Sequence, residues 1–402
     1  MKKFSICASR WLVAMSLGVC VAQAMAQDTL RPEVAKALKV AQDALAAKQS
    51  SEALDQSRKA LALPQLTPFE RLSVLRTLAV AAIGAQSWDT ATAALEELVQ
   101  SGAVPASDKL PMYESLVRVA QQQKDYARLV RHAQAYRQAG GNHPVIRTVM
   151  VQSLSLLGQH SQVVTAMQDF LAQDDAQGRK TPEEELRALA VGQRQLKNDE
   201  GYREALWRLL SAHDKPEYWA QYITHLLNTP GFNSRLELDL YRLFEDKGLL
   251  EEADEYVEMA QLALKAGLPA EAVRVMAKGF DKGVLGKGSS AAQHARLRDE
   301  VQKKMREDDA QFAQMEKSAK DGPALAILGD VHFSRQNWSA AHEVYARALQ
   351  AGGLRRESEV RLHHAISLLR AGQKQAARDM LRTVQGDATS LELARLWTLM
   401  AR

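Results

Sequence analysis

Histidines and carboxylates gather near the C-terminus, where they could in principle ligate a metal ion. Zinc sites need their ligands at fixed spacings, but His332, His342, His363 and His364 follow helix faces without such a pattern. The acidic run Glu307-Asp308-Asp309 lacks the glycine and the alternating ligands of a calcium loop. We therefore predict no metal site and no cofactor, and we interpret these side chains as parts of helix surfaces.

Motifs of common enzymes are missing as well. The sequence contains no His-Glu-x-x-His, no Gly-x-Ser-x-Gly and no glycine-rich phosphate loop after a strand. An exported hydrolase with a helical accessory region would need a catalytic domain, and no segment is left to hold one. We predict that the protein is not an enzyme and has no catalytic residues.

The stretch 248–283 shows which elements the chain is built from. One apolar stripe recurs at i, i+3, i+4 and i+7 and predicts a helix that ends at Gly267; it consists of Tyr256, Met259, Ala260 and Ala263. Pro269 then opens a second helix, whose stripe is Ala272, Val273, Met276 and Phe280. The short turn requires the two helices to be antiparallel.

Small side chains allow the two backbones of this pair to approach closely. Ala260 and Ala272 are placed at the contact, whereas Glu271 is expected on the exposed face of the second helix. Substitution of Ala272 by a larger residue is therefore expected to destabilise the pair.

The same pair recurs along the chain. Each second helix is marked by a small or aliphatic residue that starts a stripe continued four and seven residues later. These markers are Ala53, Ala91, Leu129, Val163, Ala205, Leu236, Ala272, Ala341 and Ala377. The steps between them are 38, 38, 34, 42, 31, 36, 69 and 36 residues, which cluster around the roughly 34 residues of a tetratricopeptide repeat.

The residues also resemble this family directly. Leu328-Gly329, Trp338, Ala341, Tyr345 and Ala348 match its Leu-Gly, aromatic, Ala, aromatic, Ala pattern in spacing. The resemblance implies an all-α, right-handed superhelical solenoid of antiparallel helix pairs. Aromatic residues that recur at one repeat position are interpreted as packing between helices; they are Trp88, Tyr126, Tyr202 and Trp338.

The positions of the repeats divide the chain after residue 26 into three regions. We expect a solenoid over 27–285 and a C-terminal pair of repeats with a capping helix over 323–402. Between them, 286–322 starts with a flexible Gly-Lys-Gly-Ser-Ser and continues as a polar helical segment. It is expected to form a degenerate, more exposed helical pair at which the chain flexes.

The N-terminus carries an export signal. In 1–26 a basic start precedes an apolar run and the small-x-small site Ala24-Met-Ala26. Cleavage there removes Cys7 and Cys20, the only cysteines, and lowers the formal charge from +4 to +1. We predict a periplasmic protein without membrane insertion, and we keep acylation of Cys20 as a minor alternative.

The concave surface is the expected binding surface. In solenoids it is lined by outward residues of the first helices, and this register selects Arg76, Arg194, Lys197, Asp330, Phe333 and Arg370. The near-neutral charge of the processed chain gives nucleic acid and anionic membranes little to attract them. The predicted partner is a protein or peptide, including a component of an inner- or outer-membrane complex.

A narrower resemblance suggests a context. The stretch 219–285, with Lys247-Gly-Leu-Leu and Ala266-Gly-Leu-Pro-Ala-Glu-Ala, is similar to periplasmic tetratricopeptide proteins that accompany TonB/ExbB/ExbD systems. The resemblance implies support of TonB-dependent outer-membrane uptake. The alternative is a scaffold for outer-membrane or polysaccharide envelope assembly.

Processing of the N-terminus can be checked directly. We expect the exported chain to begin at Gln27 and to contain no thiol, because the cleavage site follows the apolar run. Mass spectrometry of periplasmic protein measures this. A mature mass that retains Cys20, with or without lipid, would show that the cleavage prediction is wrong.

Overall fold

The computed structural model describes residues 29–402, and the regular structure in this range is entirely helical. It contains 20 α-helices and one short 3-10 helix, so the expected all-α class is confirmed. The predicted export signal and both cysteines lie outside the described residues. None of the helices between 29 and 402 is long and apolar enough to cross a membrane.

The chain forms two compact units, which are divided after Gly158. The boundaries expected near 286 and 322 fall inside the second unit, because long-range contacts join its parts. The first unit holds the pairs α1 (Pro32–Ala46) with α2 (Ser50–Leu61), α3 (Pro68–Gly84) with α4 (Trp88–Gln100) and α5 (Ala106–Gln122) with α6 (Tyr126–Gln138), followed by α7 (Pro144–Leu156).

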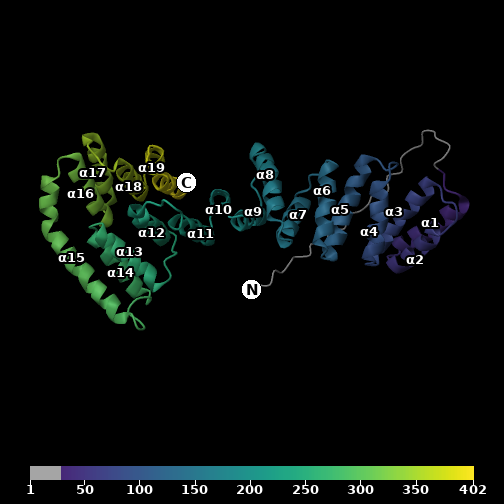
Figure 1. Ribbon diagram of the computed structural model, residues 1–402, viewed down its shortest axis with the longest axis horizontal. Helices are drawn as coiled ribbons and strands as arrows, with labels where there is room; N and C mark the ends of the chain where they lie inside the picture. Colours follow the sequence, from purple (N-terminus) through teal and green to yellow (C-terminus); the bar gives the residue numbers. More distant parts are fainter. Residues whose placement is uncertain (1–28) are drawn as a thin grey trace. The chain divides into compact units, whose positions relative to one another are not determined.

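The second unit runs from Gln159 to Arg402. Its helices are α8 (His160–Ala176), α9 (Glu183–Gln195), α10 (Asp199–His213), α11 (Pro216–Leu227), η1 (Ser234–Leu236), α12 (Glu237–Asp246), α13 (Ala253–Lys265), α14 (Pro269–Asp281), α15 (Ala291–Ser318), α16 (Gly322–Ser334), α17 (Trp338–Ala351), α18 (Glu357–Arg370), α19 (Lys374–Leu381) and α20 (Ala388–Met400) (Figure 1).

The helix register confirms the predicted repeat. All nine markers lie on the second helix of a pair or, for Leu236, in η1 directly before α12. Each marker is at most 1% exposed, so the small side chain sits where the helices meet. Within each unit, successive pairs pack on one another, as α2 does on α3 and α4 on α5.

One turn geometry closes most first helices. Two positions after the last helical residue the chain adopts a left-handed φ between +55° and +81°; these residues are Lys48, Gln86, Lys124, Gly158, Lys197, Gly267, Gln336 and Gly372. The next amide then donates to a carbonyl in the last helical turn, as Leu268 N does to Ala263 O at 2.9 Å. This satisfies a carbonyl that the helix end would leave free.

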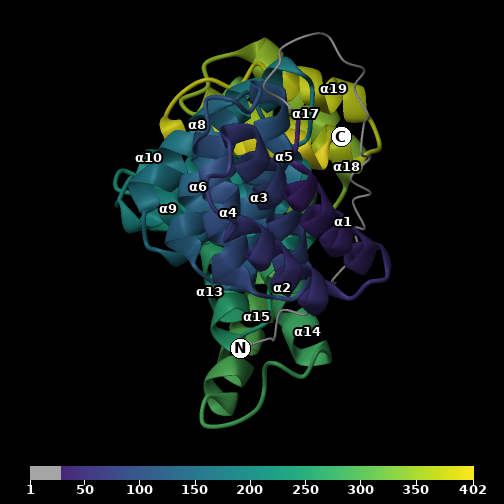
Figure 2. The same cartoon turned by 90° about the vertical axis from the view of Figure 1, so that its right-hand side faces the viewer.

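The segment 286–322 is helical, as expected, but it holds one long helix in place of a pair. Residues Ala291–Ser318 contain neither glycine nor proline, so nothing in the sequence ends the helix early. The N-terminal part of α15 packs against α14, and the two helices lie side by side in both views (Figure 2).

The C-terminal helices of the second unit return to its earlier helices. Tyr222 on α11 donates a hydrogen bond to Glu392 on α20 at 2.5 Å. Arg395 of α20 bonds Glu204 of α10 at 3.0 Å and lies 3.7 Å over the Trp207 ring. In an ordinary solenoid each repeat contacts only its neighbours. The contacts of α20 join residues that are more than 150 positions apart in the sequence. They therefore distinguish this unit from an open array.

The pair α13 and α14 confirms one packing prediction and corrects another. Ala260 and Ala272 are both fully buried, as expected. Glu271, however, is 1% exposed and forms an ion pair with Arg242. The expected exposed position was wrong because a buried arginine on another helix balances the charge.

A matched pair of alanines on α14 tests the packing. Ala272→Arg should destabilise the protein by more than the roughly 1–3 kcal/mol of an overpacked core, since the charge would be buried without a partner. Ala277 is exposed on the same helix, so Ala277→Arg should change stability by less than about 0.5 kcal/mol. Thermal unfolding of both variants measures the difference, and equal melting temperatures would contradict this register.

Candidate functional site

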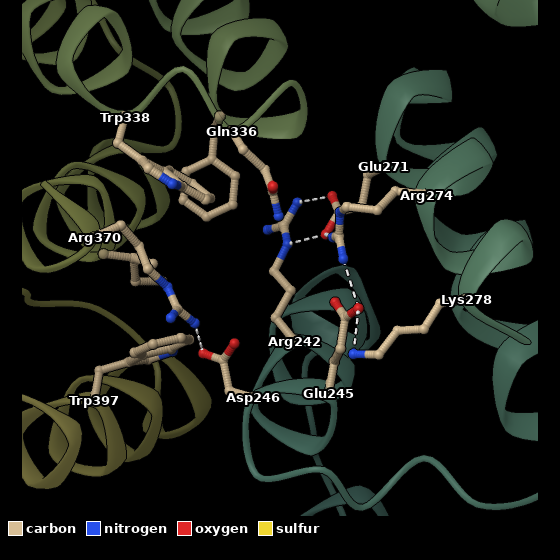
Figure 3. A pocket seen from close by; sticks show the side chains of 12 residues that line it. Arg242, Glu245, Asp246, Glu271, Arg274, Lys278, Gln336, Trp338, Arg370 and Trp397 are labelled. Atoms are coloured by element: carbon tan, nitrogen blue, oxygen red, sulfur yellow. Dashed lines mark hydrogen bonds and ion pairs between the residues drawn. The ribbon is translucent and has the colours of Figure 1, made fainter. Parts of the chain in front are cut away.

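A cavity of about 330 Å³ lies in the second unit, among α12, α14, α16, α17, α18 and α20 (Figure 3). We call it the arginine pocket. Its lining residues are Arg242, Glu245, Asp246, Glu271, Arg274, Lys278, Phe333, Gln336, Trp338, Ile366, Arg370 and Trp397. Charged side chains come mainly from α12 and α14, whereas the aromatic rings come from α16, α17 and α20.

Arg242 forms the inner wall of the pocket. Its Nε and Nη2 donate to the two carboxylate oxygens of Glu271 at 2.9 and 2.6 Å. Its Nη1 donates to Asp239 one helical turn earlier, at 2.7 Å. All three residues are at most 5% exposed. Such a bidentate pair fixes orientation as well as charge, so it locks α12 against α14.

His363 of α18 continues this network. Its Nδ1 lies 2.8 Å from Asp330 and its Nε2 lies 3.1 Å from Asp239. Burial by itself lowers the pKa of His363, but the two carboxylates raise it to about 10. The ring is therefore an imidazolium that donates from both nitrogens. Arg242 Nη1, 3.4 Å away, is a second donor to the same Asp239 and not a partner of the ring.

The positive charges of Arg242 and His363 also set the pKa of the buried Asp239 carboxylate. Burial raises the pKa of Asp239, but His363 and Arg242 outweigh this and lower it to about 2. Tyr345 donates its hydroxyl to Asp330 at 2.6 Å. The result is a chain of paired groups that joins α12 to α16, α17 and α18, so it holds the pocket together.

The outer wall carries pairs that are more exposed. Arg274 and Lys278 both donate to Glu245, at 2.5 and 3.2 Å, and Arg370 forms an ion pair with Asp246. The lining set contains no serine, threonine, cysteine or histidine. Its chemistry is thus that of charge recognition and aromatic contact.

The structure brings only some of the predicted groove residues together. Phe333 and Arg370 line the arginine pocket, and Asp330 lies behind it through His363. Phe333 is 4% exposed and lies 4.6 Å below the Arg242 guanidinium, so it supports the pocket wall.

The other predicted residues lie elsewhere. Arg194 lines a smaller cavity of about 140 Å³, in which Tyr202 also takes part. Lys197 occupies the left-handed turn after α9, at φ +55°, and is exposed. Arg76 belongs to the first unit, where it pairs with Asp108 at 3.5 Å. The role of all six residues in binding stays a prediction.

Sequence reasoning missed most of the pocket. Arg242 lies between Leu240 and Leu243 of a buried stripe, and Glu271 directly precedes the marker Ala272. A charged residue at such a position is a usable signal, because it must find a partner inside the fold. Trp338 was interpreted as packing; it does contact Phe333 edge-on at 5.1 Å, but it also lines the pocket.

Comparison with known proteins gives fold likeness only. No family model matches the chain, and no curated protein matches it. Among solved structures, the TPR2AB domain–pHSP90 complex of yeast Sti1 is similar over 67% of this chain and 98% of that chain, with 14% identity and a TM-score of 0.35.

Two further structures are similar over more of the chain. A tetratricopeptide repeat protein from Parabacteroides merdae is 10% identical over 83% of this chain and 98% of its own, with a TM-score of 0.32. Yeast Tom70 is 10% identical over 92% and 95%, with a TM-score of 0.26. These likenesses say nothing of a ligand; the tetratricopeptide-like pairing rests on the helix register.

The raised pKa of His363 makes stability depend on pH. Its pKa lies near 6.5 in the unfolded chain and about 10 in the folded one. The stabilisation is therefore fully present below about pH 6.5 and is lost as the pH rises toward 10. Between pH 6.5 and 9 we expect the free energy of unfolding of the parent to fall by roughly 3 kcal/mol more than that of His363→Gln, which cannot titrate.

Denaturant unfolding followed by tryptophan fluorescence measures this, since four of the six tryptophans lie in the second unit. His143 is exposed in the first unit, so His143→Gln should keep the parent's pH dependence. If the free energies of unfolding of the parent and of His363→Gln changed equally with pH, the buried imidazolium would not contribute to the pH dependence.

Proposed function

We propose that this protein is an exported scaffold that holds a protein or peptide partner on its array of helix pairs. The observation that carries this is the repetition of one packed pair, with buried markers and a common turn. In the first unit α1 also contacts α3, so these two first helices adjoin and share one surface. Surfaces of this kind suit the binding of extended partners.

The finer proposal places the scaffold in the periplasm, in support of TonB-dependent outer-membrane uptake. Its grounds are the predicted N-terminal export signal and the resemblance in sequence of 219–285 to TonB-associated proteins; this stretch forms α11 to α14. A scaffold for envelope assembly is the alternative, and it shares the same binding mode with a different partner.

Charge reversal on the predicted groove tests the proposal. Arg194 and Lys197 are both exposed, so Arg194→Glu with Lys197→Glu should leave helicity and melting temperature unchanged. It should nevertheless abolish complementation of a deletion strain on a scarce iron chelate, because the reversal changes the surface potential that a partner meets. Growth in rich medium should not change.

A matched control separates groove effects from charge effects. Lys303 and Arg306 are exposed on α15, and Lys303→Glu with Arg306→Glu makes the same change of net charge. This control should complement fully. Equal growth of the deletion strain and its parent under every uptake-limited condition, with altered envelope permeability, would reject the uptake role in favour of envelope assembly.

A further inference from the structure

The arginine pocket has hydrogen-bond donors left over. Within residues 29–402, Trp397 Nε1 and Arg274 Nε are buried and have no hydrogen-bond partner. Trp397 is 1% exposed, and its indole extends from α20 toward Arg370 and Asp246 (Figure 3). Buried N–H groups are nearly always paired in folded proteins. Unpaired donors that line a cavity therefore indicate a ligand that supplies acceptors.

The three carboxylates of the pocket, in contrast, have basic partners. Glu271 is taken by Arg242, and Glu245 by two basic residues of α14. Asp246 Oδ2 has no hydrogen bond in the described structure, but it meets Arg370 in an ion pair. The ligand is thus not expected to be a cation.

The charge of the lining is positive by one. Arg242, Arg274, Lys278 and Arg370 face three carboxylates, Glu245, Asp246 and Glu271. Arg370 forms its ion pair with Asp246 and is about one-third exposed, and burial of the rest of its side chain lowers its pKa. Arg242 also bonds Asp239 behind the pocket wall, so the charges around the pocket are close to balanced and favour a ligand of low charge over a phosphate.

Arg370 and Trp397 are neighbours, since the guanidinium lies 5.8 Å from the indole ring centroid. Arg370 and the Trp397 indole therefore line the same part of the pocket. Phe333, Trp338 and Ile366 add apolar surface to the lining. A volume of about 330 Å³ is at the lower end of the range for ligand sites, which suits a compact body.

We propose that the arginine pocket binds a monocarboxylate with a compact apolar body, held by Arg370 and by the indole N–H of Trp397. The carboxylate accepts from these donors, and the body contacts Phe333, Trp338 and Ile366. The ligand is either a free acid or the C-terminal residue of a polypeptide, because both present the same chemistry. Binding here does not depend on a partner at the solenoid surface.

Calorimetric titration of the purified protein with 3-phenylpropionate tests the site. We expect saturable binding, at least tenfold weaker binding of the neutral amide 3-phenylpropanamide, and weaker binding of acetate, which lacks the body. N-acetyl-glycyl-phenylalanine with a free or an amidated carboxyl forms the second arm. Tighter binding of the free-carboxyl peptide identifies a polypeptide terminus as the ligand, and tighter binding of phenylpropionate identifies a free acid.

Two variants locate the site. Trp397→Phe keeps a ring but removes the N–H, and it should weaken phenylpropionate binding roughly tenfold; Arg370→Gln should weaken it at least as much. Trp88→Phe, in the first unit, is the matched control and should bind like the parent. Melting temperatures show which variants are folded, and Arg370→Gln carries the test if Trp397→Phe does not fold.

Several results would overturn the proposal. Equal binding of the acid and its amide would mean that the charge is not recognised. Tighter binding of phenyl phosphate would replace the monocarboxylate by a phosphate ligand. Absence of binding at millimolar concentrations of every probe, or unchanged affinity in folded Trp397→Phe and Arg370→Gln, would exclude the site.

Discussion

The close approach of two helices through a small or aliphatic side chain is the constraint on which the structure depends. Ala53, Ala272 and Ala341 are fully buried, and a larger residue there would separate the helices or force strained rotamers. The left-handed turn before most second helices sets where those helices begin. Together these features reproduce one pair many times, and neighbouring pairs then bury a continuous core.

The second unit adds buried charges to this apolar framework. Apolar packing is non-directional, whereas Arg242 requires Glu271 and Asp239 at fixed places. Loss of one partner would leave an uncompensated charge in the interior, which typically costs about 3–5 kcal/mol. The network thus makes one arrangement of α12, α14 and α18 much more favourable than its alternatives, although its net contribution to stability is small.

The two units offer different kinds of surface. The first is a sequence of helix pairs with exposed ion pairs such as Arg76 with Asp108, which contribute little to stability. It also holds a buried carboxylate, Glu70, that pairs with Arg31. The second turns α20 back onto α10 and α11 and encloses a small cavity with unpaired donors. We propose a protein partner on the helix pairs, where Arg76 of the first unit and Arg194 of the second are candidate contacts, and a compact ligand in the cavity of the second unit.

The sequence by itself determined the helices, their pairing and the buried markers, because these depend on local periodicity and on small residues at fixed spacing. Ala272 and the turn at Gly267 were predictable for this reason. Of the pocket, it identified Phe333 and Arg370 as groove candidates. Only the tertiary structure placed Arg242, Glu271 and His363 together, since they are 29 to 121 residues apart. A charged residue in an apolar stripe indicates that a partner must exist, but the fold alone decides which distant carboxylate provides it.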